Sequence, residues 1–174
     1  WTFGTLAGGA DYTDRQTLWQ RTGVLDNVFG NFFRIPTRVA SVDAEIEDMI
    51  DAGIHICIAA GNDFYKADIP GGNDYDNNVL HNGNTYTYHR PGSPYSNSAF
   101  FVGNIDNSTN GGIDRPAASS KKGPAVNVWA PGTEILSTAS ELNDASYGPV
   151  TFTYPLDSNY SVMNIGGTSM SSPQ

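Results

Sequence analysis

Apolar residues change their spacing along the chain at Gly53. Before this glycine they recur three or four positions apart, which predicts an amphipathic helix whose acidic residues, Asp43 among them, face away from the apolar side. Thr37 or Ser41 is suited to begin the helix as a side-chain cap, and Gly53 is suited to end it, because glycine adopts the left-handed conformation cheaply. The apolar positions are Val39, Val42, Ile46, Met49 and Ile50.

Short apolar runs follow this helix and predict strands. They are too short for helices and several are rich in β-branched residues, and a continuous apolar strand directly after an amphipathic helix is typical of a parallel sheet covered on both faces. The pattern predicts one α/β unit with functional loops at the carboxyl ends of its strands. The expected strands are 54–60, 99–105, 126–130 and 134–138, with 151–154 and 161–165 as a hairpin.

Composition restricts the class of protein. The 174 residues suffice for one domain with a core, and 19 glycines and 10 prolines indicate many loops. A net charge of −9 argues against a nucleic-acid partner and fits a secreted enzyme, a calcium-binding protein or a merely soluble one. The single cysteine, Cys57, lies in an apolar run and is expected to be buried. No apolar run is long enough to span a membrane.

Two short stretches carry residues suited to catalysis. Asn62 follows a glycine at the end of the first expected strand, and its carboxamide can donate a hydrogen bond to a ligand. Ser169 follows Gly-Gly-Thr at the expected start of a helix, where backbone N–H groups stabilise negative charge. Each stretch alone also fits an ordinary turn or a helix cap.

Together these stretches resemble the subtilisin-like serine proteases, the subtilases. Gly167-Thr168-Ser169-Met170, with Pro173 three residues later, is similar to the family's nucleophile signature, and Ala59-Ala60-Gly61-Asn62 is similar to its oxyanion strand end. Weaker matches follow the family's order: Trp1-Thr2-Phe3-Gly4 for a cleft segment, Arg90-Pro91-Gly92 for a Tyr-Pro-Gly loop, Phe101-Val102-Gly103, Ser119–Pro124 with one inserted residue, and Val128–Gly132.

The resemblance implies a three-layer α/β fold with a mainly parallel sheet and a serine endopeptidase activity. By this resemblance Ser169 is the nucleophile, and the Asn62 side chain and the Ser169 N–H bind the oxyanion. Ala60, Gly61, Phe3 and Gly4 line the pocket for the substrate residue that precedes the cleaved bond, and Arg90–Pro91 is a cis peptide. Asparagine at position 62 separates the chain from the related sedolisins, which use an aspartate there.

The catalytic aspartate and histidine of the family have no counterpart in this sequence. No Asp-Ser/Thr-Gly or His-Gly-Thr stretch occurs; His55 is expected to be packed in a strand, and His81 and His89 lie downstream in loops. We therefore expect residues 1–174 to be the central-to-C-terminal part of one catalytic domain. Both motifs are then expected before Trp1, and the helix after Ser169 is expected to be cut in its first turn.

Other interpretations stay open at this point. Asp74, Asp76 and Asn78 alternate like calcium ligands, but no glutamate closes the loop, so a polar turn is the preferred interpretation and no cofactor is expected for catalysis.

The expected partner is a protein or peptide substrate, and oligomeric state is not indicated. Segments 63–89 and 142–160 resemble insertions. The alternative function is a non-catalytic structural or binding domain of a larger assembly.

Overall fold

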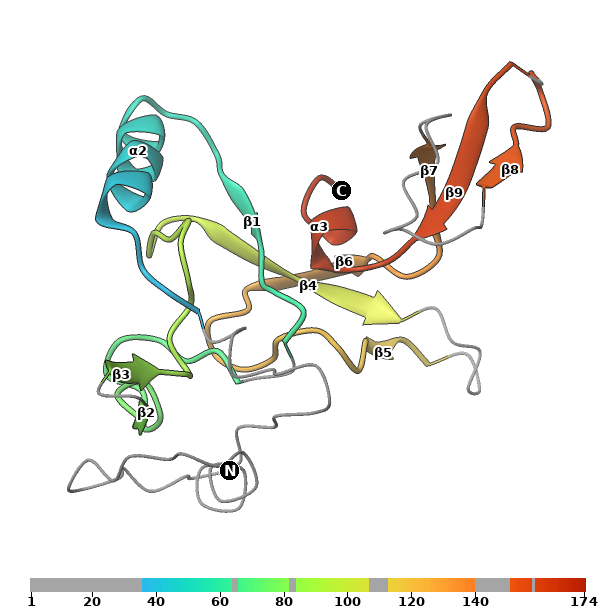
Figure 1. Cartoon of the computed structure of the whole chain (residues 1–174). Helices are drawn as coiled ribbons and strands as arrows, with labels where there is room; N and C mark the ends of the chain where they lie inside the picture. The colour runs from blue at the N-terminus through green and yellow to red at the C-terminus, as the bar shows by residue number, and fades with distance from the viewer. Residues whose placement is uncertain (1–35, 64–65, 82–83, 107–112, 140–150, 158) are drawn as a thin grey trace.

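The computed structural model describes residues 36–63, 66–81, 84–106, 113–139, 151–157 and 159–174 (Figure 1). Its central sheet contains β1 (Cys57–Ala59), β4 (Phe100–Asp106), β5 (Arg115–Pro116) and β6 (Val128–Pro131). Strand β4 pairs in parallel with β1 and with β6, as the apolar runs predicted. The short strand β5 pairs antiparallel with the end of β4, so the sheet is mixed.

The predicted helix is present as α2 (Ala40–Asp51), and Gly53 follows it with a φ of 83°. Its N-cap is Val39, and no side chain caps it, so the prediction of Thr37 or Ser41 as a cap was wrong. The helix is anchored by packing, because Ile50 lies against the core cluster of Ile58, Tyr95, Ala99 and Phe101.

Asp43 does not face solvent as the helical pattern predicted. Its Oδ1 accepts hydrogen bonds from the Ser93 hydroxyl (2.7 Å) and the Tyr95 N–H (2.9 Å), and its Oδ2 pairs with Arg38 at 2.7 Å. Burial alone would raise the pKa of Asp43, but these hydrogen bonds outweigh it and lower the pKa. The first turn of α2 is therefore fixed to the loop at Ser93.

The strand faces are more open than the apolar runs predicted. Cys57 and His55 are exposed, so the expectation that both are packed inside the sheet was wrong. Phe100 and Val128 are 46% and 43% exposed. Among the described residues β1 pairs only with β4, and α2 has no buried residue, so one face of these strands has little to pack against.

A second sheet confirms the predicted hairpin. Strand β9 (Ser161–Ile165) pairs antiparallel with β8 (Thr151–Thr153) and, on its other side, with β7 (Ile135–Ala139). In Figure 1 β9 runs directly into α3 (Thr168–Ser171), which contacts β1, β4 and β6 of the central sheet. The sequence pattern did not predict the other hairpin, β2 (Asn78–His81) with β3 (Asn84–Thr87), within segment 63–89.

The cis peptide bond lies elsewhere than predicted. Among the described residues it is Ser93–Pro94, not Arg90–Pro91. Ser93 is held by its N–H to the Thr37 carbonyl (2.9 Å) and by its hydroxyl to Asp43, so this loop is fixed to the start of α2. The architecture is α/β, and the three-layer arrangement stays a prediction. None of the helices in the described ranges is long and apolar enough to cross a bilayer.

Candidate active site

The carboxamide of Asn62 lies against the residue that precedes Ser169. Asn62 Oδ1 accepts a hydrogen bond from the Thr168 N–H at 2.9 Å and another from the Thr168 hydroxyl at 3.1 Å. Because both contacts use the oxygen, the amide nitrogen is the end of Asn62 that can donate to a ligand. The two stretches singled out in the sequence, 106 positions apart, thus meet in the fold.

Gly61 joins this contact to the adjacent loop. Its N–H donates to Thr168 Oγ1 at 3.1 Å, and its carbonyl accepts the Lys121 N–H at 2.9 Å. Its φ of 108° lies in the left-handed region that favours glycine, and a Cβ there would lie 3.2 Å from Lys121 Cε. The backbone of Gly61 therefore binds both Thr168 and Lys121.

Ser169 is exposed at the first turn of α3. The N–H groups on either side of it are used, since Thr168 donates to Asn62 and Met170 donates to the Gly167 carbonyl at 3.0 Å. Within the described part of the chain the Ser169 N–H makes no hydrogen bond. The turn therefore presents one hydroxyl and one backbone donor together.

Close backbone packing holds this turn in place. Gly167 N–H donates to the Gly132 carbonyl at 2.7 Å. A Cβ on Gly132 would lie 2.0 Å from Ser171 Oγ, 2.7 Å from Asn104 Oδ1 and 2.7 Å from the Gly167 carbonyl oxygen. Only a glycine allows α3 to approach the loop after β6 this closely. The glycine of the matching stretch Val128–Gly132 is therefore required by the local packing.

A cavity of about 290 Å³ opens beside Asn62. Ala60 and Gly61, both predicted to line a substrate pocket, are part of its wall, and Ile58 and Phe101 of the core also border it. Its volume is near the lower end for ligand pockets, which begin at roughly 300 Å³. The remaining lining residues are Pro36, Thr37, Ala59, Asp63, Gly92, Ser93, Pro94 and Lys121.

Two charged residues lie in the cavity wall, and they form an ion pair. Lys121 Nζ is 3.4 Å from Asp63 Oδ2, and the two side chains are 4% and 10% exposed. Burial lowers the pKa of Lys121, although the Asp63 carboxylate acts in the opposite direction. Ser120, fully buried, supports the loop, because its Oγ accepts the Asn104 N–H (3.1 Å) and donates to the Lys121 carbonyl (3.0 Å).

The two histidines whose side chains the structure describes, His55 and His89, do not join the candidate site. His89 is buried, and its Nδ1 is 2.8 Å from the Lys66 carbonyl, so Nδ1 carries the proton. Burial lowers the pKa of His89, which is therefore neutral at pH 7. His55 is exposed before β1, and His81 lies in β2. No hydrogen bond joins His55 or His89 to Ser169 among the described residues.

Of the three residues that alternate like calcium ligands, Asp74 and Asp76 each form an ion pair with a basic side chain. Lys66 Nζ contacts Asp74 Oδ2 at 2.6 Å and Asp68 Oδ2 at 3.0 Å, and both aspartates are buried. Asp76 instead pairs with Arg90. The described residues contain no group of three or more His, Cys, Asp and Glu side chains placed to hold a metal ion.

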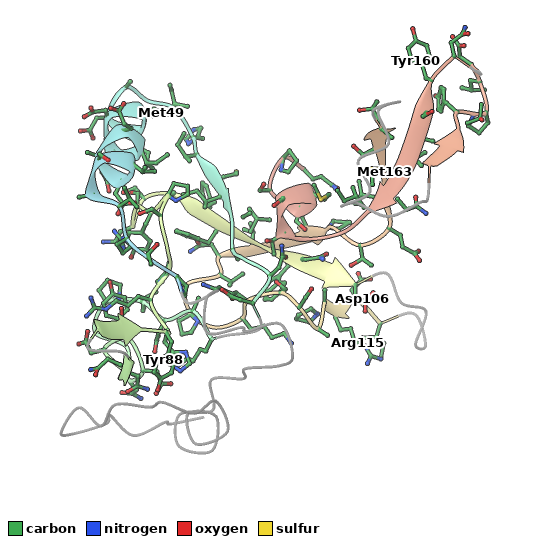
Figure 2. All side chains as sticks on the ribbon, viewed as in Figure 1. Met49, Tyr88, Asp106, Arg115, Tyr160 and Met163 are labelled. Carbon is green, nitrogen blue, oxygen red and sulfur yellow. The ribbon has the colours of Figure 1, made fainter. Side chains whose placement is uncertain are left out.

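Sequence reasoning missed the residues that position the site. Thr168 was treated as part of a motif, yet it contacts both Gly61 and Asn62. Lys121 belongs to the stretch with an inserted residue, and that insertion was the available signal. Phe3 and Gly4 lie outside the described residues, so their predicted place in the pocket stays a prediction. Figure 2 shows the side chains around β1, β4 and α3 as sticks.

Comparison with known families identifies a match that covers most of the chain. The profile of the subtilase family, peptidase S8, matches residues 21–174. The match includes both stretches that meet at Asn62 and Thr168. No individually curated protein matches the chain.

Proposed function

The chain belongs to the subtilase family, and we propose that it carries the nucleophile and the oxyanion donors of a serine endopeptidase. The observation that supports this most directly is the pair of hydrogen bonds from Thr168 to Asn62 Oδ1. They engage the oxygen of the carboxamide, so the amide nitrogen of Asn62 is the group that would donate to a ligand, and Ser169 next to Thr168 is exposed. The family alone supports a serine-protease type of function; the assignment of residues is our proposal.

In the proposed reaction Ser169 Oγ attacks the carbonyl carbon of the scissile peptide bond. A histidine, expected upstream of Trp1, takes the hydroxyl proton and later gives it to the leaving amine. The Asn62 amide and the Ser169 N–H donate to the oxygen that becomes negative. The C–N bond then breaks, and water hydrolyses the resulting ester on Ser169.

The competing proposal is a subtilase-fold domain that binds without cleaving. Ser169 and Asn62 support the enzyme, because a site that does no chemistry gains nothing from an oriented carboxamide beside an exposed hydroxyl. Upstream Asp-x-Gly and His-Gly-Thr stretches in the longer protein that we expect to contain this chain would support it further.

A fluorophosphonate probe tests the proposal on that longer protein. We expect labelling at Ser169, loss of labelling in Ser169→Ala, and cleavage of a denatured protein substrate by the wild type only. Peptide mapping identifies the labelled serine. A folded protein that is neither labelled nor able to cleave any substrate would establish the binding domain instead.

A further inference from the structure

The wall of the cavity beside Asn62 includes the buried residue Lys121 and its ion-pair partner Asp63. Apart from Lys121 and Asp63, its lining residues are uncharged. Gly61 borders the cavity, and its N–H donates to Thr168. The cavity wall therefore includes the residue that directly precedes Asn62 in the chain. Whatever side chain enters this cavity meets Lys121 and Asp63 together.

Lys121 has hydrogen-bond donors that its contacts do not use. Its side chain packs over Gly61, where a Cβ would lie 3.2 Å from Cε and 3.3 Å from Cδ, and this fixes the stem. An ammonium group has three N–H donors. Among the described residues it contacts the single carboxylate of Asp63, at 3.4 Å, which is longer than the roughly 2.7–2.9 Å of a charge-assisted hydrogen bond.

We propose that Lys121 determines substrate specificity by donating a hydrogen bond to the side chain that precedes the cleaved bond. The preferred side chain ends in an oxygen acceptor, as glutamine and glutamate do. An apolar side chain of the same length, methionine, leaves the buried ammonium with Asp63 alone. This inference rests on the proposed endopeptidase function, because it assigns the cavity to a substrate residue.

Asp63 decides between the two acceptor side chains. Its carboxylate shares the cavity wall, so it repels a glutamate carboxylate and does not repel a glutamine amide. Wild-type protein is therefore expected to prefer glutamine over glutamate. Removing the charge in Asp63→Asn leaves the ammonium without a carboxylate and is expected to reverse that order.

The chain offers a matched control beside Lys121. Lys122 is exposed and does not line the cavity, whereas Lys121 is buried and does. Its carbonyl accepts the Ala67 N–H at 2.7 Å, a backbone contact that a side-chain substitution leaves in place. Lys122→Met therefore removes a positive charge near the cavity without removing the proposed donor.

Peptide binding tests the proposal without requiring catalysis. The full-length protein with Ser169→Ala is titrated with acetylated tetrapeptide amides that differ only in a last residue of glutamine, glutamate or methionine. We expect glutamine to bind about 10- to 100-fold more tightly than methionine, the range for a hydrogen bond to a charged group. Lys121→Met should abolish the difference, and Lys122→Met should keep it.

Lys121→Met leaves Asp63 buried without its cation, so this variant can lose its fold. The double variant Lys121→Met/Asp63→Asn removes both charges and keeps the side-chain volumes similar. It should fold, by circular dichroism and thermal unfolding, and should bind the three peptides equally. Equal binding of glutamine and methionine peptides by the Ser169→Ala protein, or an unchanged preference in the folded double variant, overturns the proposal.

The same series in cleavable substrates separates the two proposals. If the protein with Ser169 intact cleaves substrates but shows no dependence on Lys121, the specificity proposal fails and the endopeptidase stands. If it cleaves nothing while the Lys121-dependent peptide preference remains, the endopeptidase fails and Lys121 is the recognition residue of a peptide-binding domain.

Discussion

The Thr168 side chain both accepts and donates at the candidate site: its hydroxyl accepts the Gly61 N–H at 3.1 Å and lies 3.1 Å from Asn62 Oδ1. The backbone N–H of Thr168 reaches the same oxygen at 2.9 Å. One fully buried hydroxyl therefore fixes the neighbour of Ser169 to two consecutive residues after β1. The orientation of the carboxamide depends on Thr168 as much as on Asn62 itself.

Thr168→Val should weaken the site while preserving its shape. Valine keeps the volume but neither accepts from Gly61 nor donates to Asn62. A buried group left without its partner costs about 1–3 kcal/mol. We expect a loss of that size in the free energy of unfolding, measured by denaturant titration, and a slower reaction of Ser169 with fluorophosphonate. Thr168→Ser retains the hydroxyl and should lose less than half as much.

Asn62→Leu should act on the reaction rather than on substrate binding. It removes the proposed oxyanion donor and is expected to lower kcat by about 10²- to 10³-fold with little change in KM, a magnitude known for a serine protease of this family rather than obtained from this structure. Steady-state kinetics on the full-length protein measure both constants. Asn159→Ala, exposed near β9, is the control and should leave both unchanged. A kcat within threefold of wild type would remove Asn62 from the proposed mechanism.

Ser171→Ala should not lower the stability of the protein, whereas Thr168→Ala should. Both residues are buried on the four-residue helix α3, but Ser171 Oγ has no hydrogen-bond partner within the described part of the chain. Removing a buried hydroxyl that is not paired relieves its desolvation cost, so Ser171→Ala is expected to be neutral or stabilising. Thr168→Ala is expected to destabilise. Thermal unfolding of the two variants compares them, and a larger loss in Ser171→Ala contradicts the assignment of contacts.

The cluster of Lys66, Asp68 and Asp74 should stabilise segment 66–77 over a defined pH range. Burial would raise the pKa of Asp68, but hydrogen bonds from Lys66 and the N–H groups of Asp74 and Ile69 outweigh it, so the pKa lies below its ordinary 3.8. This stabilisation is complete above pH 3.8 and is lost as pH falls through the lowered pKa. The hydrogen bond with Asp74 chiefly raises the pKa of Lys66, so its contribution is complete below pH 10.5 and is lost as pH rises through the raised value.

The amide proton of Asp74 reports this behaviour, because it donates to Asp68 Oδ2 at 3.0 Å. Its chemical shift should change on acidification below about pH 4, as Asp68 takes up a proton. Asp68→Asn should remove the acid-dependent change. A midpoint above pH 3.8 in the wild-type protein would mean that Asp68 is not stabilised as a carboxylate.

Sequence periodicity predicted helices and strands correctly where the spacing of apolar residues fitted only one type of element. Alternation in 151–154 and 161–165 gave the hairpin of β8 and β9, and the helical spacing up to Ile50 gave α2. Periodicity did not show which faces of the strands are buried, because burial depends on packing against residues far away in the chain. Cys57 and Phe100 therefore proved exposed despite their apolar neighbours.

The candidate site was predictable only as far as its motifs extended. The stretches at Asn62 and Ser169 were singled out from residue types, and their contact through Thr168 follows from β9 leading into α3 beside β1. The insertion near Lys121 was visible in the sequence, but the sequence did not show which lysine lines the cavity, because that depends on the packing of the Lys121 side chain over Gly61. The prediction of a cis peptide at Arg90–Pro91 was wrong, because a motif match does not determine whether the bond before its proline is cis or trans.

Gly61→Ala should separate a backbone effect from a contact effect. A Cβ at this position combines a φ of 108° with contacts of 3.2 Å and 3.3 Å to the Lys121 stem. Gly71 has a similar φ of 81°, but a Cβ there would meet nothing within 4 Å. Gly71→Ala therefore measures the conformational cost alone, of order 1–3 kcal/mol, without touching the site.

The difference between the two alanine variants gives the cost of displacing Lys121 and Thr168. Overpacking typically adds about 1–3 kcal/mol, so Gly61→Ala should lower the free energy of unfolding by more than Gly71→Ala. It should also slow fluorophosphonate labelling of Ser169, because Gly61 holds Thr168 by its N–H and Lys121 by its carbonyl. Gly71→Ala should label at the wild-type rate. If both variants lose the same stability and label equally fast, Gly61 serves only as a turn residue, and the coupling between cavity and nucleophile is absent.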